Sequence, residues 1–151
     1  MNFCGEGTMT KTVLKQELKP ELKQGFRQGL KQELTEQIHQ YFDALYFCDL
    51  EILAQVFHPK AHYTCTTHGE LLHLSMEQYF DVVSHRQSPA SLKQSRQDKI
   101  ISIDIVGDHM ALAKVQCVIE PKFFTDFLSF IFIDGRWQII NKVFHYQTDK
   151  F

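Results

Sequence analysis

The sequence predicts an α+β fold in which three helices lie on one side of an antiparallel sheet. Helical periodicity is confined to the chain before residue 90, where a single short strand pair interrupts it. Four long strand-like segments follow between residues 99 and 146. Helices that precede the main strands in this way segregate to one face of an antiparallel sheet.

Apolar spacing and end signals define the first two helices. The first begins at Thr35 and ends near Cys48, and its apolar residues follow the i, i+3, i+4, i+7 rule: Ile38, Tyr41, Phe42 and Leu45. Asp49 is suited to cap the second helix. The apolar face of that helix comprises Ile52, Leu53, Val56 and Phe57, and Pro59 ends it.

A short strand pair and a third helix come next. Residues 61–67 are rich in strand-forming residues, Gly69 is a turn candidate, and residues 70–74 form the second strand. Ser75 and Gln78 have the spacing of a capping box. They predict a helix that ends at Ser88-Pro89 and whose apolar face contains Met76, Tyr79, Phe80 and Val83.

The remaining strands form two hairpins. Residues 99–106 and 109–119 flank the turn candidate Gly107-Asp108, and residues 123–133 and 136–146 flank Asp134-Gly135. A two-residue loop makes Ile133 face Arg136, and this register fixes every later pair. The pairs predicted on one face are Phe132–Trp137, Phe130–Ile139, Leu128–Asn141, Asp126–Val143 and Phe124–His145.

The far end of this face mixes polar and apolar side chains. An unpaired buried Asp126 carboxylate would cost several kcal/mol. The polar groups therefore either line a cavity or lie at a wet end of the sheet, bonded to backbone. A cavity with apolar walls and few polar groups is typical of a small-molecule site.

The opposite face is too apolar for water alone. Its apolar residues are Phe127, Ile131, Ile133, Ile140, Phe144 and Tyr146. Such a face is normally covered, and a second copy of the same sheet is the simplest cover. We therefore predict a homodimer through the sheet face.

Composition limits the partners and the compartment. The 151 residues suit one ordinary domain, and 16 Lys and Arg against 18 Asp and Glu argue against nucleic-acid binding. No apolar run approaches the roughly 18 residues of a membrane span, and no secretory signal is evident. We expect a cytoplasmic protein with reduced cysteines and with neither a nucleic-acid nor a membrane partner.

Residues 1–34 are predicted to form a repetitive N-terminal arm or tail. A four-residue repeat (LKQE, LKPE, LKQG, FRQG, LKQE) begins at Leu14, and Pro20, Gly25 and Gly29 weaken any helix there. The segment is either a partly helical tail without chemistry or an amphipathic arm that docks on a partner. The domain then spans residues 35–147, and residues 148–151 form a C-terminal tail.

Three stretches carry a family resemblance: FHPKA, IISIDIVGDHMALAKV and FTDFLSFIFIDGRWQIINKVFH. Together with the element order they resemble the nuclear-transport-factor-2-like superfamily, and within it the bacterial "putative lumazine-binding", SnoaL-like branch. The resemblance covers about residues 35–147. It implies a strongly curved, mixed or antiparallel sheet of the cystatin-like type, wrapped around the helices into a cone with a deep pocket. Phe127 stands where similar sequences often carry Tyr.

The resemblance also implies candidate site residues. Relatives that catalyse use an Asp or His base in a largely apolar pocket, so the catalytic candidates are Asp126 and His145, predicted to be diagonal neighbours. Asp49 lies near a functional aspartate of some relatives, but its role as a helix cap is favoured. The candidate ligand-binding residues are Tyr46, His62, His85, Phe124, Asp126, Leu128, Asn141, Val143 and His145. Of His62 and Tyr63, only one can enter the cone.

Three functions remain open. The first is a non-enzymatic or weakly enzymatic pocket that binds an aromatic or heterocyclic molecule. The second is a cofactor-free lyase, isomerase or hydrolase that uses Asp/His acid–base catalysis, and the third is a dimeric assembly module with a vestigial pocket. We expect no cofactor and no metal, because nucleotide fingerprints are absent and Pro59 prevents a regular helix between His58 and His62, which are four residues apart.

Overall fold

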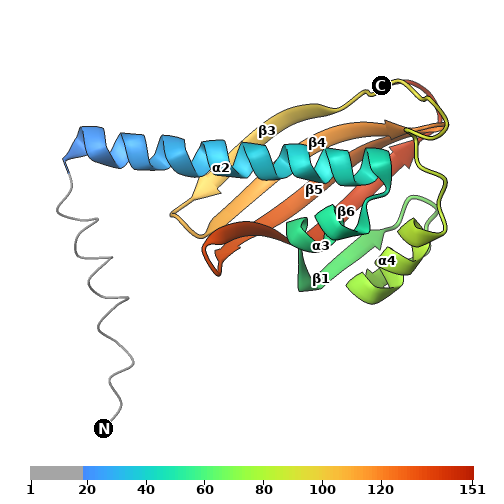
Figure 1. Ribbon diagram of the computed structural model, residues 1–151, viewed down its shortest axis with the longest axis horizontal. Helices are drawn as coiled ribbons and strands as arrows, with labels where there is room; N and C mark the ends of the chain where they lie inside the picture. Colours follow the sequence, from blue (N-terminus) through green and yellow to red (C-terminus); the bar gives the residue numbers. More distant parts are fainter. Residues whose placement is uncertain (1–18) are drawn as a thin grey trace, which may run out of the picture.

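The computed structural model describes residues 19–151, in which three helices lie on one face of a six-stranded sheet (Figure 1). The helices are α2 (Pro20–Phe47), α3 (Leu50–Val56) and α4 (Met76–Ser84). The strands are β1 (Phe57–Cys65), β2 (Leu72–Ser75), β3 (Lys99–Val106), β4 (Met110–Ile119), β5 (Lys122–Ile133) and β6 (Arg136–Gln147). The predicted α+β class is confirmed.

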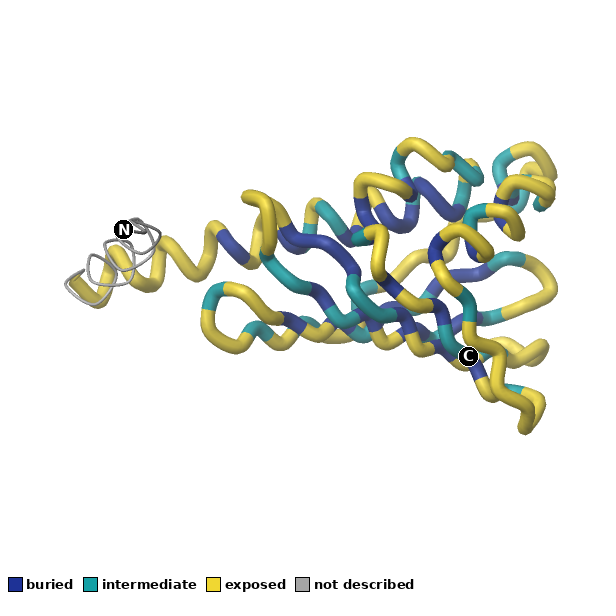
Figure 2. The backbone as a smooth tube through the Cα atoms, turned by 90° about the horizontal axis from the view of Figure 1, so that it is seen from below, coloured by how far each residue is buried: buried dark blue, intermediate teal, exposed yellow. Residues whose placement is uncertain are grey.

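The sheet is curved and mixed. Its strand order is β2-β1-β6-β5-β4-β3, and β1 runs parallel to β6 while every other pair is antiparallel. Figure 2 shows the helices along one side of the sheet, with the buried stretches of both facing each other. The core therefore lies between the helices and the concave side of the sheet, which we call the inner face.

Helix α2 begins earlier than predicted. It starts at Pro20, because the first helical turn tolerates a residue without an N–H, and it continues through Gly25 and Gly29. Leu30 is buried, and its carbonyl oxygen accepts a 3.2 Å hydrogen bond from the Trp137 indole. The first turns extend beyond the strands (Figure 1). Residues 1–18 of the predicted arm lie outside the described residues.

Local sequence signals also identify the ends of the helices. Helix α2 ends at Phe47, where Cys48 has a left-handed backbone (φ 49). The Asp49 carboxylate accepts hydrogen bonds from the backbone N–H groups of Glu51 and Ile52, which confirms the predicted cap. Ser75 and Gln78 form the complete capping box of α4. Strand β1 differs from expectation, because it begins at Phe57 directly after α3 and includes Pro59.

The register of the last hairpin is right near the turn and wrong beyond it. Ile133 pairs with Arg136, and Phe130 pairs with Ile139 as predicted. Ser129 then pairs with Asn141, because Ile140 is an extra residue that forms a β-bulge in β6. The predicted pairs Leu128–Asn141, Asp126–Val143 and Phe124–His145 are therefore replaced by Leu128–Lys142, Asp126–Phe144 and Phe124–Tyr146.

The bulge exchanges the two faces of β6 beyond Ile140, since side chains alternate with a period of two. Lys142 and Phe144 turn inward and are 3% and 5% exposed. Val143 and His145 turn outward and are exposed. No helix of the described residues 19–151 is long and apolar enough to cross a membrane.

Candidate functional site

Lys142 is a charged side chain in the middle of the core. Its ammonium nitrogen lies 3.7 Å from Oδ2 of Asp126, which is fully buried. It also lies 5.0–6.0 Å from the centres of five aromatic rings: Tyr41, Tyr63, Tyr79, Phe124 and Phe144. Ring faces attract cations, so carboxylate and rings together offset part of the cost of removing this ammonium from water.

Asp126 is only half satisfied. Its Oδ2 accepts a 2.5 Å hydrogen bond from the Tyr41 hydroxyl in addition to the contact with Lys142. Its Oδ1 has no hydrogen-bond partner among residues 19–151, and the same is true of the buried Tyr79 hydroxyl. Buried polar atoms are nearly always partnered, so each of these two atoms requires an explanation.

Five elements bring these groups together. Tyr41 comes from the inward stripe of α2, and Tyr79 comes from the apolar face of α4. Tyr63 is supplied by β1, Asp126 by β5 and Lys142 by β6. The rings of Tyr63 and Tyr79 stack at a centroid distance of 4.3 Å, so this contact packs α4 against β1.

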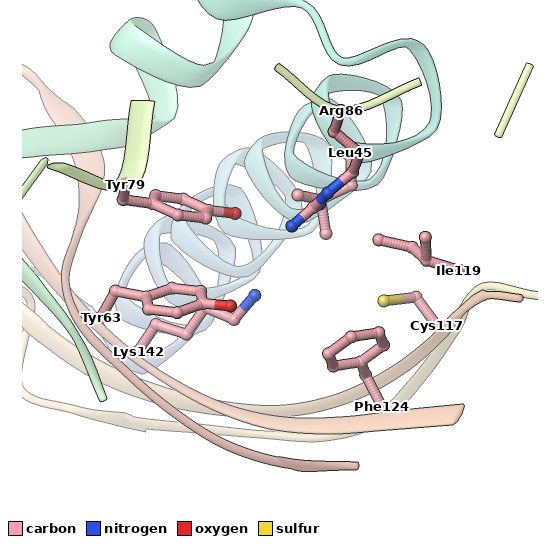
Figure 3. A pocket seen from close by; sticks show the side chains of 8 residues that line it. All are labelled: Leu45, Tyr63, Tyr79, Arg86, Cys117, Ile119, Phe124 and Lys142. Carbon is pink, nitrogen blue, oxygen red and sulfur yellow. The ribbon is translucent and has the colours of Figure 1, made fainter. Parts of the chain in front are cut away.

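A small cavity opens beside this cluster. It is lined by Leu45, Tyr63, Tyr79, Arg86, Cys117, Ile119, Phe124 and Lys142. The tyrosine hydroxyls, the ammonium of Lys142 and the guanidinium of Arg86 all point into it (Figure 3). The space open to the centre of a water-sized sphere is about 10 Å³, which is room for about one water molecule.

Burial keeps the phenols protonated. Removal from water raises the pKa of Tyr63 to about 12, although the charge of Lys142 opposes this effect. Burial also raises the pKa of Tyr79 and of Tyr41, and for Tyr41 the neighbouring Asp126 carboxylate adds to the increase. Around neutral pH the Tyr63 and Tyr79 hydroxyls can donate hydrogen bonds to whatever enters the cavity, whereas the Tyr41 hydroxyl donates to Asp126. The Cys117 thiol has its pKa raised by burial as well, so it is no thiolate nucleophile.

Only part of the predicted site comes together. Phe124 lines the cavity, while Asp126 and Leu128 lie on the same inner face of β5. Asn141, Val143 and His145 lie on the outer face because of the bulge, so the predicted Asp126–His145 pair is wrong: the two side chains are on opposite sides of the sheet. His145 instead shares a 3.0 Å hydrogen bond with Thr67.

The other three candidates lie outside the cavity lining. His62 is exposed and stacks on His73 at 4.6 Å, so Tyr63 is the residue of that pair that enters the cone. Tyr46 donates a hydrogen bond to the Gln94 carbonyl oxygen. His85 is exposed and shares a hydrogen bond with the Asp81 carbonyl.

The sequence interpretation missed Lys142, Arg86 and the buried phenols of Tyr41 and Tyr79. Lys142 could not be assigned to the inner face without knowledge of the bulge. A weak signal existed for the tyrosines, because a buried phenol on an apolar helix face needs a hydrogen-bond partner. Nothing in the local sequence marks Arg86.

Comparison with known proteins decides the family. The family described as "Putative lumazine-binding" matches residues 30–145, most of the chain. The chain belongs to this family. The match begins inside α2 and ends in β6, so it includes the lysine, the aspartate and the three tyrosines.

Three relatives of this lumazine-binding family member can be compared directly. The aldolase FrzH of Cladobotryum sp is 32% identical over 91 residues, which are 59% of this chain and 69% of that protein. An NTF2-like protein of unknown function from Shewanella baltica OS155 superimposes with a TM-score of 0.70 at 23% identity, covering 79% of this chain and 94% of the other. An NTF2-like protein of unknown function from Silicibacter pomeroyi DSS-3 gives 0.68 at 24% identity, covering 76% and 93%.

The solved structures confirm the predicted nuclear-transport-factor-2-like fold. At these identities they carry the fold alone. What the pocket of this lumazine-binding family member does must therefore be argued from its own residues.

Proposed function

We propose that this protein binds a small molecule whose polar end enters the cavity between Lys142, Tyr63 and Tyr79. The observation that carries the proposal is the buried Lys142–Asp126 pair, whose lysine lines a cavity together with Tyr79. Asp126 Oδ1 and the Tyr79 hydroxyl both lack a hydrogen-bond partner among residues 19–151. A buried ion pair stabilises a fold no better than well-packed apolar residues of similar volume. Stability alone therefore does not explain the pair, whereas a ligand that completes its hydrogen bonds does.

The walls support a planar ring as the rest of the ligand. Phe124, Tyr63 and Tyr79 present aromatic surface, and Leu45 and Ile119 add aliphatic surface. Since the space holds about one water molecule, the ring of an aromatic or heterocyclic ligand must displace side chains at the edge of the cavity. Arg86, which is only half-buried, is the side chain best placed to move.

Methyl NMR tests this function without a substitution. The protein, labelled at Leu and Ile methyl groups, is titrated with a panel of small aromatic and heterocyclic compounds, both neutral and charged. We expect at least one compound to shift the Leu45 and Ile119 methyl signals, while Leu112 and Ile133 on the outer face stay unchanged. A panel that moves neither cavity residue, or moves only outer-face signals, would contradict the proposal.

A second candidate is carbon–carbon bond chemistry, favoured by the relative named aldolase. The predicted Asp126–His145 pair is unavailable, but Asp126 Oδ1 has no partner among residues 19–151, and Oδ2 of the same carboxylate lies 3.7 Å from the Lys142 ammonium. Oδ1 would take the proton next to a carbonyl group, and Lys142 would stabilise the enolate oxygen that forms. The enolate carbon would then attack a second carbonyl carbon, and the resulting alkoxide would take up the proton.

Deuterium exchange tests this second candidate. Carbonyl compounds that bind in the NMR panel are incubated with the protein in heavy water. We expect their α-protons to exchange faster with the wild-type protein than with Asp126→Asn. Equal exchange with both proteins would exclude Asp126 as the base.

The outer face of the sheet supports the proposed homodimer. Phe127, Val143, Ile133 and Leu112 are 40–49% exposed on neighbouring strands. The predicted set changes at two positions, because Phe144 turns into the core and Tyr146 joins the inner face. Large apolar side chains exposed together on one face of a sheet typically mark an interface. Cytoplasmic location remains a prediction.

A further inference from the structure

The charged groups at the cavity sum to one positive formal charge. Lys142 and Asp126 neutralise each other across 3.7 Å. Arg86 also lines the cavity, and within residues 19–151 no carboxylate lies within ion-pair distance of it. An arginine that faces a partly buried site is expected to be paired with a negative charge, and the described residues supply none for Arg86.

The charge of Arg86 acts on the other side chains of the cavity. It lowers the pKa of the Tyr63, Tyr79 and Cys117 side chains, in opposition to the larger effect of burial. Figure 3 shows its guanidinium directed toward the Tyr79 hydroxyl and the Lys142 ammonium from the opposite side of the space. Two cations thus approach one small volume from two sides.

Hydrogen-bond donors converge on the same volume. The fully buried Tyr79 hydroxyl has no partner among the described residues, and the Tyr63 hydroxyl lies next to it. A guanidinium presents a planar fork of N–H groups that matches the two oxygens of a carboxylate. The Arg86 guanidinium, the Lys142 ammonium and the unpartnered Tyr79 hydroxyl are therefore all available to a single planar monoanion.

We propose that the ligand carries one carboxylate, held between Arg86 and Lys142 with the Tyr79 hydroxyl donating to it. The assignment rests on the proposed function, which it narrows to an acid. One unit of negative charge balances the cavity, whereas a dianion leaves an excess. A carboxylate is a small anionic group that would displace the single water that the space accommodates, and the remainder of the ligand lies toward Leu45 and Ile119.

The test uses pairs of compounds that differ only in charge. The methyl-labelled protein is titrated with acetate and acetamide, benzoate and benzamide, and nicotinate and nicotinamide, with inorganic phosphate as a different anion. We expect at least one acid to shift Leu45 and Ile119 and to bind about tenfold or more tightly than its amide, a difference of about 1.4 kcal/mol. Arg86→Gln should lower the affinity of that acid about tenfold and leave its amide unchanged. Arg136→Gln, a substitution at the exposed β5–β6 turn, is the matched control and should change neither.

Each other outcome overturns the inference. If an amide binds as tightly as its acid, or if Arg86→Gln weakens both equally, the ligand is not recognised as an anion, although the proposed function stands. If phosphate binds more tightly than every acid, the site is one for a phosphate group. If no acid moves Leu45 or Ile119 while a neutral heterocycle does, the carboxylate is excluded and only the binding function remains.

Discussion

Lys142 and Asp126 are two side chains whose charges depend on each other. Neither contacts bulk water, and each is the nearest opposite charge of the other. The aromatic rings around the ammonium soften this dependence without replacing it, because cation–π attraction is weaker than a direct ion pair. The pair should therefore respond to substitution as a unit.

Removal of Asp126 alone should be costly. Asp126→Asn leaves the Lys142 ammonium buried without its counter-charge, and such a loss typically costs about 3–5 kcal/mol. Chemical denaturation measures the change in the free energy of unfolding. The double variant Asp126→Asn/Lys142→Met removes both charges, so it should be destabilised by less than the sum of the two single variants. Additive effects would show that the two charges do not stabilise each other.

The stability contribution of Tyr63 should depend on pH in a defined window. Its folded-state pKa, about 12, lies above the ordinary tyrosine value of 10.0, so the folded protein retains the phenol proton to higher pH than the unfolded chain. The contribution is complete below about pH 10 and is lost as pH rises toward about 12, by at most about 1.4 kcal/mol per pH unit. Denaturation at about pH 9 and about pH 11 should show a steeper loss for the wild type than for Tyr63→Phe. Equal losses would place the Tyr63 hydroxyl in contact with solvent.

At the scale of the element, local signals predicted well and non-local ones did not. The Asp49 cap, the Ser75 capping box and the Asp134-Gly135 turn depend on residues within four positions, and each is present. The bulge at Ile140 coincides with a register shift where the parallel strand β1 pairs with β6. That pairing joins residues about 80 apart in sequence, so no window along β6 reveals it. Lys142 was missed as a site residue for this reason.

Helix α2 offers a test of its unpredicted first turns. Gly25 and Gly29 are helical, and a Cβ added at either position would meet nothing within 4 Å. Each Gly→Ala substitution should stabilise the protein by about 0.5–1 kcal/mol, since alanine loses less backbone entropy on folding. Thermal denaturation should detect the increase. Gly135→Ala is the contrast, because its φ of 77 disfavours a side chain and should lower stability.

The cap of α3 separates a structural aspartate from a functional one. Asp49→Ala should cost about 1 kcal/mol, while Asp49→Asn should cost little because asparagine caps equally well. Ligand titration by methyl NMR should be the same for both variants. A selective loss of binding in Asp49→Asn would instead show that the carboxylate has a role beyond the cap.

The whole molecule is a curved sheet with one covered side and one bare side. The helices cover the inner face, and the apolar residues around Phe127 occupy the outer one. The family match and the solved structures settle the fold at this scale, and the element order in the sequence predicted it. What lies against the outer face depends on a second molecule, which no single chain encodes locally.

Light scattering tests the assembly. We expect the wild-type protein to be a dimer that buries about 800 Å² per partner. Phe127→Lys places a charge in the middle of the outer face and should give a folded monomer. Phe47→Lys is a matched control, since Phe47 is 54% exposed and belongs to α2, a helix on the other side of the sheet from the outer face (Figure 2). A monomeric wild type, or a dimer that survives Phe127→Lys, would contradict the arrangement.

The single extra residue in β6 decides which alternate side chains of the strand face the interior. Upstream of Ile140 the strand is fixed by the turn, and downstream the same residues could present either of two alternating sets to the interior. With the bulge the interior receives Lys142 and Phe144; without it, Asn141, Val143 and His145 would take their place. Deletion of Asn141, directly after the bulge, would thus turn Lys142 outward with no change in the identity of any remaining residue, whereas deletion of Ile140 itself would remove the bulge and keep Lys142 inside. In such a fold, the presence and position of a β-bulge are as informative about specificity as the identity of the side chains.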